Sequence, residues 1–279
     1  MKITAVIVLY NPEKDVADNI KSYANYVDNV IAVDNSDKYI MSSLESIKSI
    51  QNLSYISLSG NHGIAYALNI GIENSLKKGS DWILTMDQDS RFSGNLIYIY
   101  KEFLNSCKVE NIGILCPIYL FDRAREKKQA VYKTKKMVMQ SANLVNVHAI
   151  RKIGMYDEKL FIDGVDYEYC FRIRKAGYLI VQCANAKLKH APAETRILKM
   201  GNYTIFKYGV ASPLRYYYQA RNLFYIALKY KSLRILCECL YKLAKILFLF
   251  DNKMNYLRMY MKGIFDCVNN KFGKYDETK

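Results

Sequence analysis

Three short segments of almost unbroken apolar residues place the strongest limit on the fold of this chain. They are ITAVIVLY (Ile3 to Tyr10), NVIAVDN (Asn29 to Asn35) and WILTM (Trp82 to Met86). Strands that are buried on both faces carry such runs, whereas strands with one face in water alternate polar and apolar residues. Spaced apolar residues over 12–26 and 61–77 predict helices between these strands, and LSYISL predicts a further strand. We therefore predict an α/β fold with a mostly parallel central sheet flanked by helices.

Composition limits the class of protein further. The chain has 279 residues, seven scattered cysteines and a formal net charge of +15. No C-x-x-C spacing occurs, so neither a disulfide framework nor a zinc site is predicted, and a reducing cytoplasm is favoured. The first residues, MKITAVIVLYNPE, lack a cleavage site and are too short to span a bilayer, which favours a strand over a signal peptide.

The pattern is less regular after residue 92. IGILCPIYL and MVMQSANLVNV each indicate a strand, and RYYYQARNLFYIALKYKSLRILCECLYKLAKILFLF indicates one or two basic amphipathic helices. From Leu214 to the end there are 13 basic and five acidic residues, a net charge of +8. Such an excess predicts an anionic partner: nucleic acid, anionic lipid or a phosphorylated substrate.

Polar clusters follow three of the predicted strands, at Tyr10-Asn11-Pro12, Asp34-Asn35-Ser36 and Asp87-Gln88-Asp89. Each cluster alone is equally typical of a turn or a helix cap. All three, however, occupy the carboxyl ends of strands, where open α/β sheets bind their ligands.

The glycines of GNHGIAYALNIG do not form a dinucleotide fingerprint. Asn61 is either the N-cap of the helix that follows or part of a helix N-terminus offered to phosphate or sugar oxygens.

Asp87 and Asp89 are two residues apart at a strand end, so their carboxylates point to the same side. Two adjacent carboxylates repel one another unless a cation lies between them. This arrangement suits Mg²⁺ or Mn²⁺, with the remaining coordination positions taken by substrate phosphate oxygens and water.

Five segments together resemble one known family. VIVLYNP, AVDNS, GNHGIAYALNIG, LTMDQDS and FIDGVDYEYCFRIRKAGY, in this order and spacing, are similar to family 2 glycosyltransferases of the GT-A fold, and to bacterial rhamnosyltransferases in particular. The resemblance covers about residues 1–190. It implies a catalytic domain over 1–195, with a nucleotide-binding half (1–90) and an acceptor and base half (91–195), followed by a basic helical region over 196–279.

The resemblance also implies roles for individual residues. Asp34 matches the aspartate that hydrogen-bonds the pyrimidine ring of the nucleotide. Asp89 matches the direct metal ligand, Asp87 a residue nearer the ribose or a metal-bound water, and His190 a further metal or phosphate ligand. The residues expected at the donor are Tyr10, Asn11, Asp34, Asn61, Gly63, Asn69, Asp87 and Gln88.

Asp166 matches the catalytic base of the family. Relatives have Glu-Asp where this chain has Val165-Asp166, which makes Asp163 a competitor for the role. Asp163 or Asp166 could instead only favour the positive end of a helix that begins there. Glu168 and Arg172 are spaced four residues apart, which predicts an ion pair on a helix surface.

The resemblance predicts an inverting transferase that takes a nucleotide-sugar donor, dTDP-L-rhamnose or alternatively a UDP-hexose, with Mg²⁺ or Mn²⁺. It implies a glycan or lipid-linked acceptor in surface polysaccharide synthesis, at the inner face of the cell membrane. The basic C-terminal helices either bind an anionic membrane surface, or pack on the catalytic domain or form a homodimer interface. A nucleic-acid-binding protein is a remote alternative, because it leaves the strand-end aspartates unexplained, and a sugar nucleotidyltransferase would need a Gly-rich N-terminal loop.

Overall fold

The computed structural model describes residues 1–37, 41–92, 94–107, 109–120, 132–189, 194–200 and 203–276. These residues form two compact units. The N-terminal unit comprises the described residues up to 158 together with 166–189, and the C-terminal unit comprises 159–165 together with the described residues from 194 onward.

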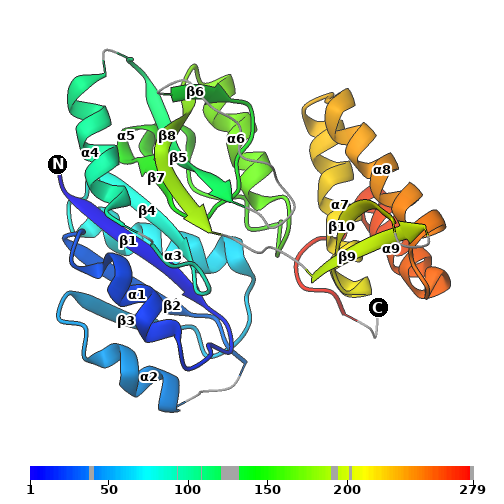
Figure 1. Cartoon of the computed structure of the whole chain (residues 1–279), viewed down its shortest axis with the longest axis horizontal. Helices are drawn as coiled ribbons and strands as arrows, with labels where there is room; N and C mark the ends of the chain where they lie inside the picture. Colours follow the sequence, from blue (N-terminus) through cyan, green and yellow to red (C-terminus); the bar gives the residue numbers. More distant parts are fainter. Residues whose placement is uncertain are drawn as a thin grey trace. The chain divides into compact units, whose positions relative to one another are not determined.

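The N-terminal unit is built on an eight-stranded sheet with the order β3-β2-β1-β4-β7-β5-β8-β6 (Figure 1). Its strands are β1 (Ile3–Leu9), β2 (Asn29–Asp34), β3 (Leu53–Ser57), β4 (Trp82–Asp87), β5 (Ile112–Leu120), β6 (Tyr132–Lys135), β7 (Asn143–Asn146) and β8 (Leu179–Lys189). The first four are parallel, β7 is antiparallel to β4 and β5, β8 is parallel to β5, and β6 is antiparallel to β8. The predicted α/β class, with a central sheet flanked by helices, is confirmed; the sheet is parallel over β3-β2-β1-β4 and mixed beyond β4.

Helices connect and cover these strands. They are α1 (Val16–Ala24), α2 (Met41–Lys48), α3 (Ile64–Lys77), α4 (Leu96–Ser106), α5 (Val147–Ile153) and α6 (Val165–Lys175). Side chains of α1, α2 and α4 join the core on one face of the sheet, and α3 lies against the other face, where its Gly71 meets Val6 of β1. Both faces of the parallel strands are therefore buried, which explains their continuous apolar sequence.

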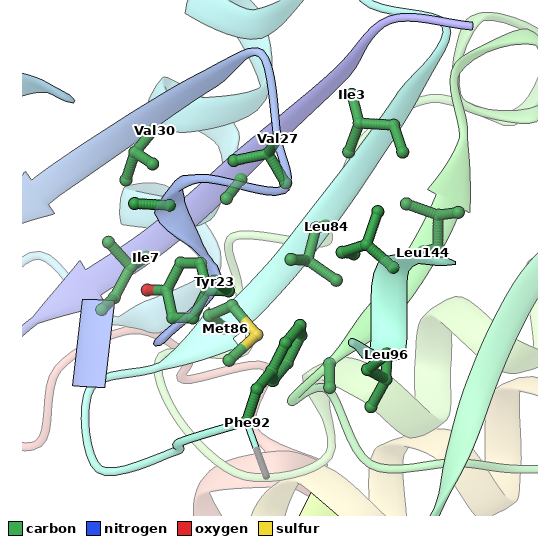
Figure 2. Packing of buried hydrophobic residues seen from close by; sticks show 14 of the residues in the cluster. Ile3, Ile7, Tyr23, Val27, Val30, Leu84, Met86, Phe92, Leu96 and Leu144 are labelled. Carbon is green, nitrogen blue, oxygen red and sulfur yellow. The ribbon is translucent and has the colours of Figure 1, made fainter. Parts of the chain in front are cut away.

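The core beneath β1 and β4 is closely packed (Figure 2). Tyr23 of α1 contacts Phe92 with ring centroids 5.4 Å apart, and both lie beside Met86 of β4. Burial raises the pKa of Tyr23 far above its ordinary value, so this ring stays neutral. The core fixes the strands whose carboxyl ends carry the polar clusters.

The C-terminal unit contains a two-stranded antiparallel sheet and three helices. They are β9 (Glu194–Met200), β10 (Tyr203–Val210), α7 (Pro213–Lys229), α8 (Leu233–Leu249) and α9 (Lys253–Val268). Gly263 of α9 lies directly against the backbone of Tyr217 in α7, so the two helices approach more closely than side chains would allow. Helices α7, α8 and α9 lie within the region 196–279 that was predicted to be helical, whereas the strands β9 and β10 at its start were not predicted.

Two further features bear on the sequence predictions. All seven cysteines are free thiols. Among the described residues, no helix combines the length and apolar character that crossing a bilayer requires.

The contact between α3 and β1 generates a stability prediction. A methyl group at position 71 would overlap Val6 Cγ1. Gly71→Ala should therefore lower the free energy of unfolding by about 1–3 kcal/mol, although the same exchange in an open helix is stabilising. Glu73→Ala, on the exposed side of the same helix, is the control and should change little. Urea denaturation followed by circular dichroism measures both, and a stabilised Gly71→Ala variant would contradict this packing.

Candidate active site

The strand-end clusters lie at one edge of the sheet. In the parallel register, Leu9 of β1 is opposite Asp34 of β2, and Val8 of β1 is opposite Asp87 of β4. Asp34 and Asp87 therefore flank β1 on two sides, about 10 Å apart across two strand spacings. The expected gathering of the three clusters at the carboxyl edge is observed.

The Gln88 side chain joins the ends of β1 and β4. Its Oε1 accepts a hydrogen bond from the Tyr10 backbone N–H (2.8 Å), and its Nε2 donates to the Tyr10 carbonyl oxygen (3.1 Å). The Gln88 carbonyl in turn accepts from Asn19 Nδ2 (3.0 Å). Gln88 and Tyr10, both predicted at the donor, thus hold the edge together, and the Tyr10 side chain is exposed.

The Asp34 carboxylate is buried and held on both oxygens. Oδ1 accepts from the Ser36 N–H (2.9 Å), and Oδ2 accepts from the Tyr55 hydroxyl (2.6 Å). Ser36 Oγ accepts from the Asn11 N–H (2.7 Å), which ties the turn after β1 to the turn after β2. These bonds fix the direction of the carboxylate, so Asp34 is a pre-oriented acceptor at the base of the edge.

Asn35 and Asn61 order the loop that leads into α3. Asn35 Oδ1 accepts from the His62 N–H (2.8 Å), and Asn35 Nδ2 donates to Asn61 Oδ1 (3.1 Å). The same Asn61 oxygen accepts from the Gly63 N–H (3.1 Å). Gly63, with a φ of 93°, is the N-cap of α3, so the N-cap expectation for Asn61 is wrong by two residues. The positive end of α3 follows directly after this loop.

Asn69 lies inside the N-terminal unit. Its Nδ2 donates to the Tyr156 carbonyl (2.9 Å) and to Glu158 Oε1 (2.7 Å), and its Oδ1 accepts from the Tyr156 N–H (2.9 Å). The Asn69 amide group therefore donates its hydrogen bonds to the loop after α5. This arrangement supports an internal role for Asn69 in place of the predicted donor contact.

The Asp87-Gln88-Asp89 turn is anchored from the segment before β7. The Asp87 N–H donates to Ser141 Oγ (3.2 Å), and Gln140 Nε2 lies 3.5 Å from Asp87 Oδ1. Ser141 Oγ is also 2.7 Å from Ser90 Oγ. Asp87 is half-buried and Asp89 is exposed, so the pair can face a ligand in solvent while the backbone stays fixed.

The donor set of this turn fits a hard divalent cation. Two carboxylates supply oxygen ligands and leave positions for diphosphate oxygens and water, as is usual for Mg²⁺. Among the described residues, no group of three or more His, Cys, Asp or Glu is placed to hold a metal ion. The predicted ligand His190 lies outside the described residues.

Asp166 lies in the first turn of α6 and is half-buried. One of its oxygens accepts from the Tyr167 N–H (2.9 Å). Two residues on, the predicted ion pair of Glu168 with Arg172 is present at 2.8 Å. It is not a surface pair, because the Glu168 side chain is fully buried and Arg172 also donates to the carbonyl of Met155 (2.7 Å). Arg172 therefore ties α6 to the loop after α5.

Tyr119 connects Asp87 and Asp166 electrostatically. Burial is the largest cause that raises the pKa of the Tyr119 hydroxyl, and the neighbouring negative charges of Asp87 and Asp166 raise it further. The hydroxyl is 2.7 Å from the Met139 carbonyl oxygen. Asp87 and Asp166, from β4 and α6, thus both lie within electrostatic range of one buried hydroxyl in the N-terminal unit.

Asp163 belongs to the C-terminal unit and has a different partner. Its two carboxylate oxygens accept from Arg215 Nε (2.6 Å) and Nη2 (2.7 Å) of α7. Asn222 Nδ2, also on α7, donates to the carbonyls of Ile162 (2.7 Å) and Asp163 (2.8 Å). Asp163 adopts a φ of 65° there, a left-handed conformation that is uncommon for residues other than glycine but is adopted by Asp more readily than by most. The Asp163 carboxylate therefore stabilises this loop through Arg215, and this role differs from the one predicted for Asp166.

Some contributors to the site gave no signal in the sequence. Tyr55 lies within a predicted strand, and Ser141 and Gln140 lie in a stretch predicted as a continuous strand that narrows to β7. Their roles depend on contacts between segments far apart in the chain. Only the pairing of β4 with β7 brings Ser141 to Asp87.

Comparison with protein-family models identifies the family to which this chain belongs. Residues 4–163 match the model of glycosyl transferase family 2. The chain belongs to this family. The matched region contains Asp34 and the Asp87-Gln88-Asp89 turn, so the resemblance found in the motifs is confirmed. The chain is therefore a glycosyltransferase with the GT-A fold.

Relatives extend the match beyond the family region. The dTDP-rhamnosyl transferase RfbF of Shigella flexneri is 29% identical over 291 residues, which cover 95% of each chain. The low-salt glycan biosynthesis hexosyltransferase Agl10 of Haloferax volcanii is 22% identical over 305 residues, covering 98% of this chain and 92% of the relative. Among solved structures, residues 1–349 of S. aureus TarS match with a TM-score of 0.49 and 14% identity, covering 97% of this chain and 72% of that one.

The contrasting environments of the two carboxylates generate a stability prediction. Asp163→Asn removes a bidentate ion pair, and we expect the free energy of unfolding to fall by about 1–2 kcal/mol, since Arg215 is partly solvated. Asp251→Asn is the matched control, because Asp251 pairs with Arg196 in the same unit while almost fully exposed, and its variant should melt like the parent. Calorimetric melting measures both, and an unchanged Asp163→Asn midpoint would contradict the structural role.

Proposed function

We propose that this glycosyltransferase transfers L-rhamnose from dTDP-L-rhamnose with inversion at the anomeric carbon. The observation that carries the proposal is the placement of Asp34 and Asp87 on both sides of β1 at the carboxyl edge of the sheet. This edge offers an acceptor for a nucleotide base and, about 10 Å away, a pair of carboxylates for a diphosphate-bound cation. The choice of rhamnose rests on the similarity to the dTDP-rhamnosyl transferase over nearly the whole chain.

The donor nucleotide would lie across the ends of β1 and β2. Asp34 is held by Tyr55 and Ser36 with its carboxylate oriented, and we assign it to the N–H of the pyrimidine ring. Tyr10 and Asn11 border this position from the turn after β1. The loop residues Asn61 and Gly63 precede the positive end of α3, which favours bound negative charge.

Asp89 is assigned as the direct metal ligand, with Asp87 nearer the ribose or a metal-bound water. When bound, Mg²⁺ or Mn²⁺ neutralises the charge that develops on the departing nucleoside diphosphate. The protein's own contribution is geometric. The Ser141 and Gln140 contacts hold the Asp87 backbone and carboxylate, so little reorganisation is needed when the donor arrives.

Asp166 is assigned as the general base. It would take the proton from an acceptor hydroxyl as that oxygen attacks the anomeric carbon, in a single displacement. Asp166 is half-buried at the start of α6, where the helix N-terminus favours its charged form. Asp163 is the weaker candidate, because both of its oxygens accept hydrogen bonds from Arg215.

A UDP-hexose is the alternative donor, and the similarity to a hexosyltransferase supports it. Asp34 does not separate the two donors, because thymine and uracil present the same N–H to a carboxylate. We further propose a glycan or lipid-linked acceptor in surface polysaccharide synthesis, reached from the cytoplasmic face of the membrane.

Replacement of Asp89 tests the metal assignment. Asp89→Asn should fold normally, since the exposed side chain adds little to the core, yet it should lose metal-dependent donor binding. Titration calorimetry with dTDP or UDP, with and without Mn²⁺, measures this. Asp18→Asn, which removes an exposed carboxylate from α1, is the control. Equal Mn²⁺-dependent affinity in Asp89→Asn and the parent would sink the ligand assignment.

Replacement of Asp166 separates binding from chemistry. Asp166→Asn should bind dTDP nearly as well as the parent but release dTDP from dTDP-L-rhamnose, with an acceptor glycan present, about 10²–10⁴-fold more slowly. Asp163→Asn is the comparison. It is assayed well below its melting temperature, so that a loss of turnover does not come from unfolding of the loop that Asp163 stabilises. A larger loss of turnover in Asp163→Asn would mean that the base is the other carboxylate.

A further inference from the structure

Helix α8 of the C-terminal unit is apolar on the side that faces solvent as well as on the side that packs inside the unit, where Ile235 and Ile246 are buried. Large exposed apolar residues lie along one side of it: Leu233, Leu236, Leu240, Leu247 and Phe248. Leu233 and Phe248 are each 78% exposed. A helix on the surface of a globular protein normally presents polar residues at such positions. We call these five residues, together with the exposed Cys237, the outer face of α8.

The side of α8 that faces the unit interior carries a charge. Lys245 is buried, its Nζ donates to the Gly209 carbonyl oxygen (2.7 Å), and its ammonium group lies over the rings of Tyr208 (5.9 Å) and Phe250 (5.8 Å). Ile246 beside it is fully buried in the core of the unit. If α8 rotated to bury its leucines, the contacts of Lys245 and Ile246 would break. These contacts therefore fix the orientation of α8 and keep the leucines of the outer face exposed.

The exposed charged residues of α8 and α9 are basic, and the exposed Asp251 between the two helices is paired with Arg196. Both helices lie wholly within the described residues. The exposed charged residue of α8 is Arg234, and those of α9 are Lys253 and Arg258. The acidic residues of the two helices, Glu238 and Asp266, are half-buried and buried. An apolar stripe beside basic residues is typical of helices that lie in the interface of an anionic membrane.

We propose that the outer face of α8 binds the anionic phospholipid surface of a membrane, with the helix axis parallel to the bilayer. The 17 residues of α8 give a contact about 25 Å long. A second copy of the chain is the competing occupant, but residues 214–279 carry a net charge of +8, which repels a copy and attracts an anionic leaflet. The inference deepens the membrane location in the proposed function by naming the surface that makes contact.

Cys237 provides a direct reporter. It lies in the outer face and is the exposed cysteine among seven, so a thiol-reactive bimane can be attached there in the full chain. Vesicles of phosphatidylglycerol should shift the bimane emission to the blue, and phosphatidylcholine vesicles should not. In a Cys237→Ser background, bimane on Ile205→Cys of β10 is the control for a position off α8, and its emission should stay unchanged. Equal shifts at both positions would overturn the assignment.

Substitution then tests the energetic role. Leu240→Gln with Phe248→Gln should weaken sedimentation with phosphatidylglycerol vesicles about 100-fold, at roughly tenfold for each apolar group kept from the bilayer. Both side chains are exposed, so folding should be unaffected, and Ile205→Gln is the matched exposed apolar control. Unchanged binding in the double variant, or a dimer without lipid that the double variant abolishes, would overturn the proposal. The assay contains no donor or acceptor, so its failure is separable from failure of the proposed reaction.

Discussion

Carboxylates crowded at the end of a parallel sheet are the constraint on which the rest of this structure depends. Burial of β1, β2 and β4 on both faces forces the chain to emerge at one edge, and the residues that emerge include Asp34, Asp87 and Asp89. Negative charges so placed are stable only with hydrogen-bond donors or a cation. Asp34 receives donors from the protein itself, whereas Asp89 is exposed. Under the proposed function, this contrast divides the edge into a preformed part for the nucleotide base and a part that metal and diphosphate would complete.

The two candidate bases differ for an equally physical reason. Asp163 contributes to the C-terminal unit, where Arg215 holds its oxygens and Asn222 holds its backbone. Asp166, three residues later, lies in the first turn of α6 in the N-terminal unit and accepts a hydrogen bond from the Tyr167 N–H. Asp163, with its positive φ, therefore stabilises a loop, and Asp166 is left as the proposed base.

Sequence alone predicted the parallel half of the sheet, because strands buried on both faces leave continuous apolar runs such as that of Ile3–Leu9. The strand-end aspartates followed from the same reasoning. The β9–β10 hairpin was missed because the exposed side chains of β10 include apolar ones such as Ile205, which obscures alternation. The sequence predicted an amphipathic helix at α8 but not which side of it is buried. Lys245 is buried and Leu240 is exposed because of packing partners that are distant in the sequence.

The most direct test of the central claim is a crystal structure of the chain with dTDP and Mn²⁺, with anomalous scattering to locate the metal. The account predicts one Mn²⁺ peak bound by Asp89 and the diphosphate, with Asp87 near the ribose or a metal-bound water. The thymine ring should accordingly be hydrogen-bonded to Asp34. A nucleotide bound away from the carboxyl edge of β1, β2 and β4, or a metal peak with no contact to Asp87 or Asp89, would contradict it.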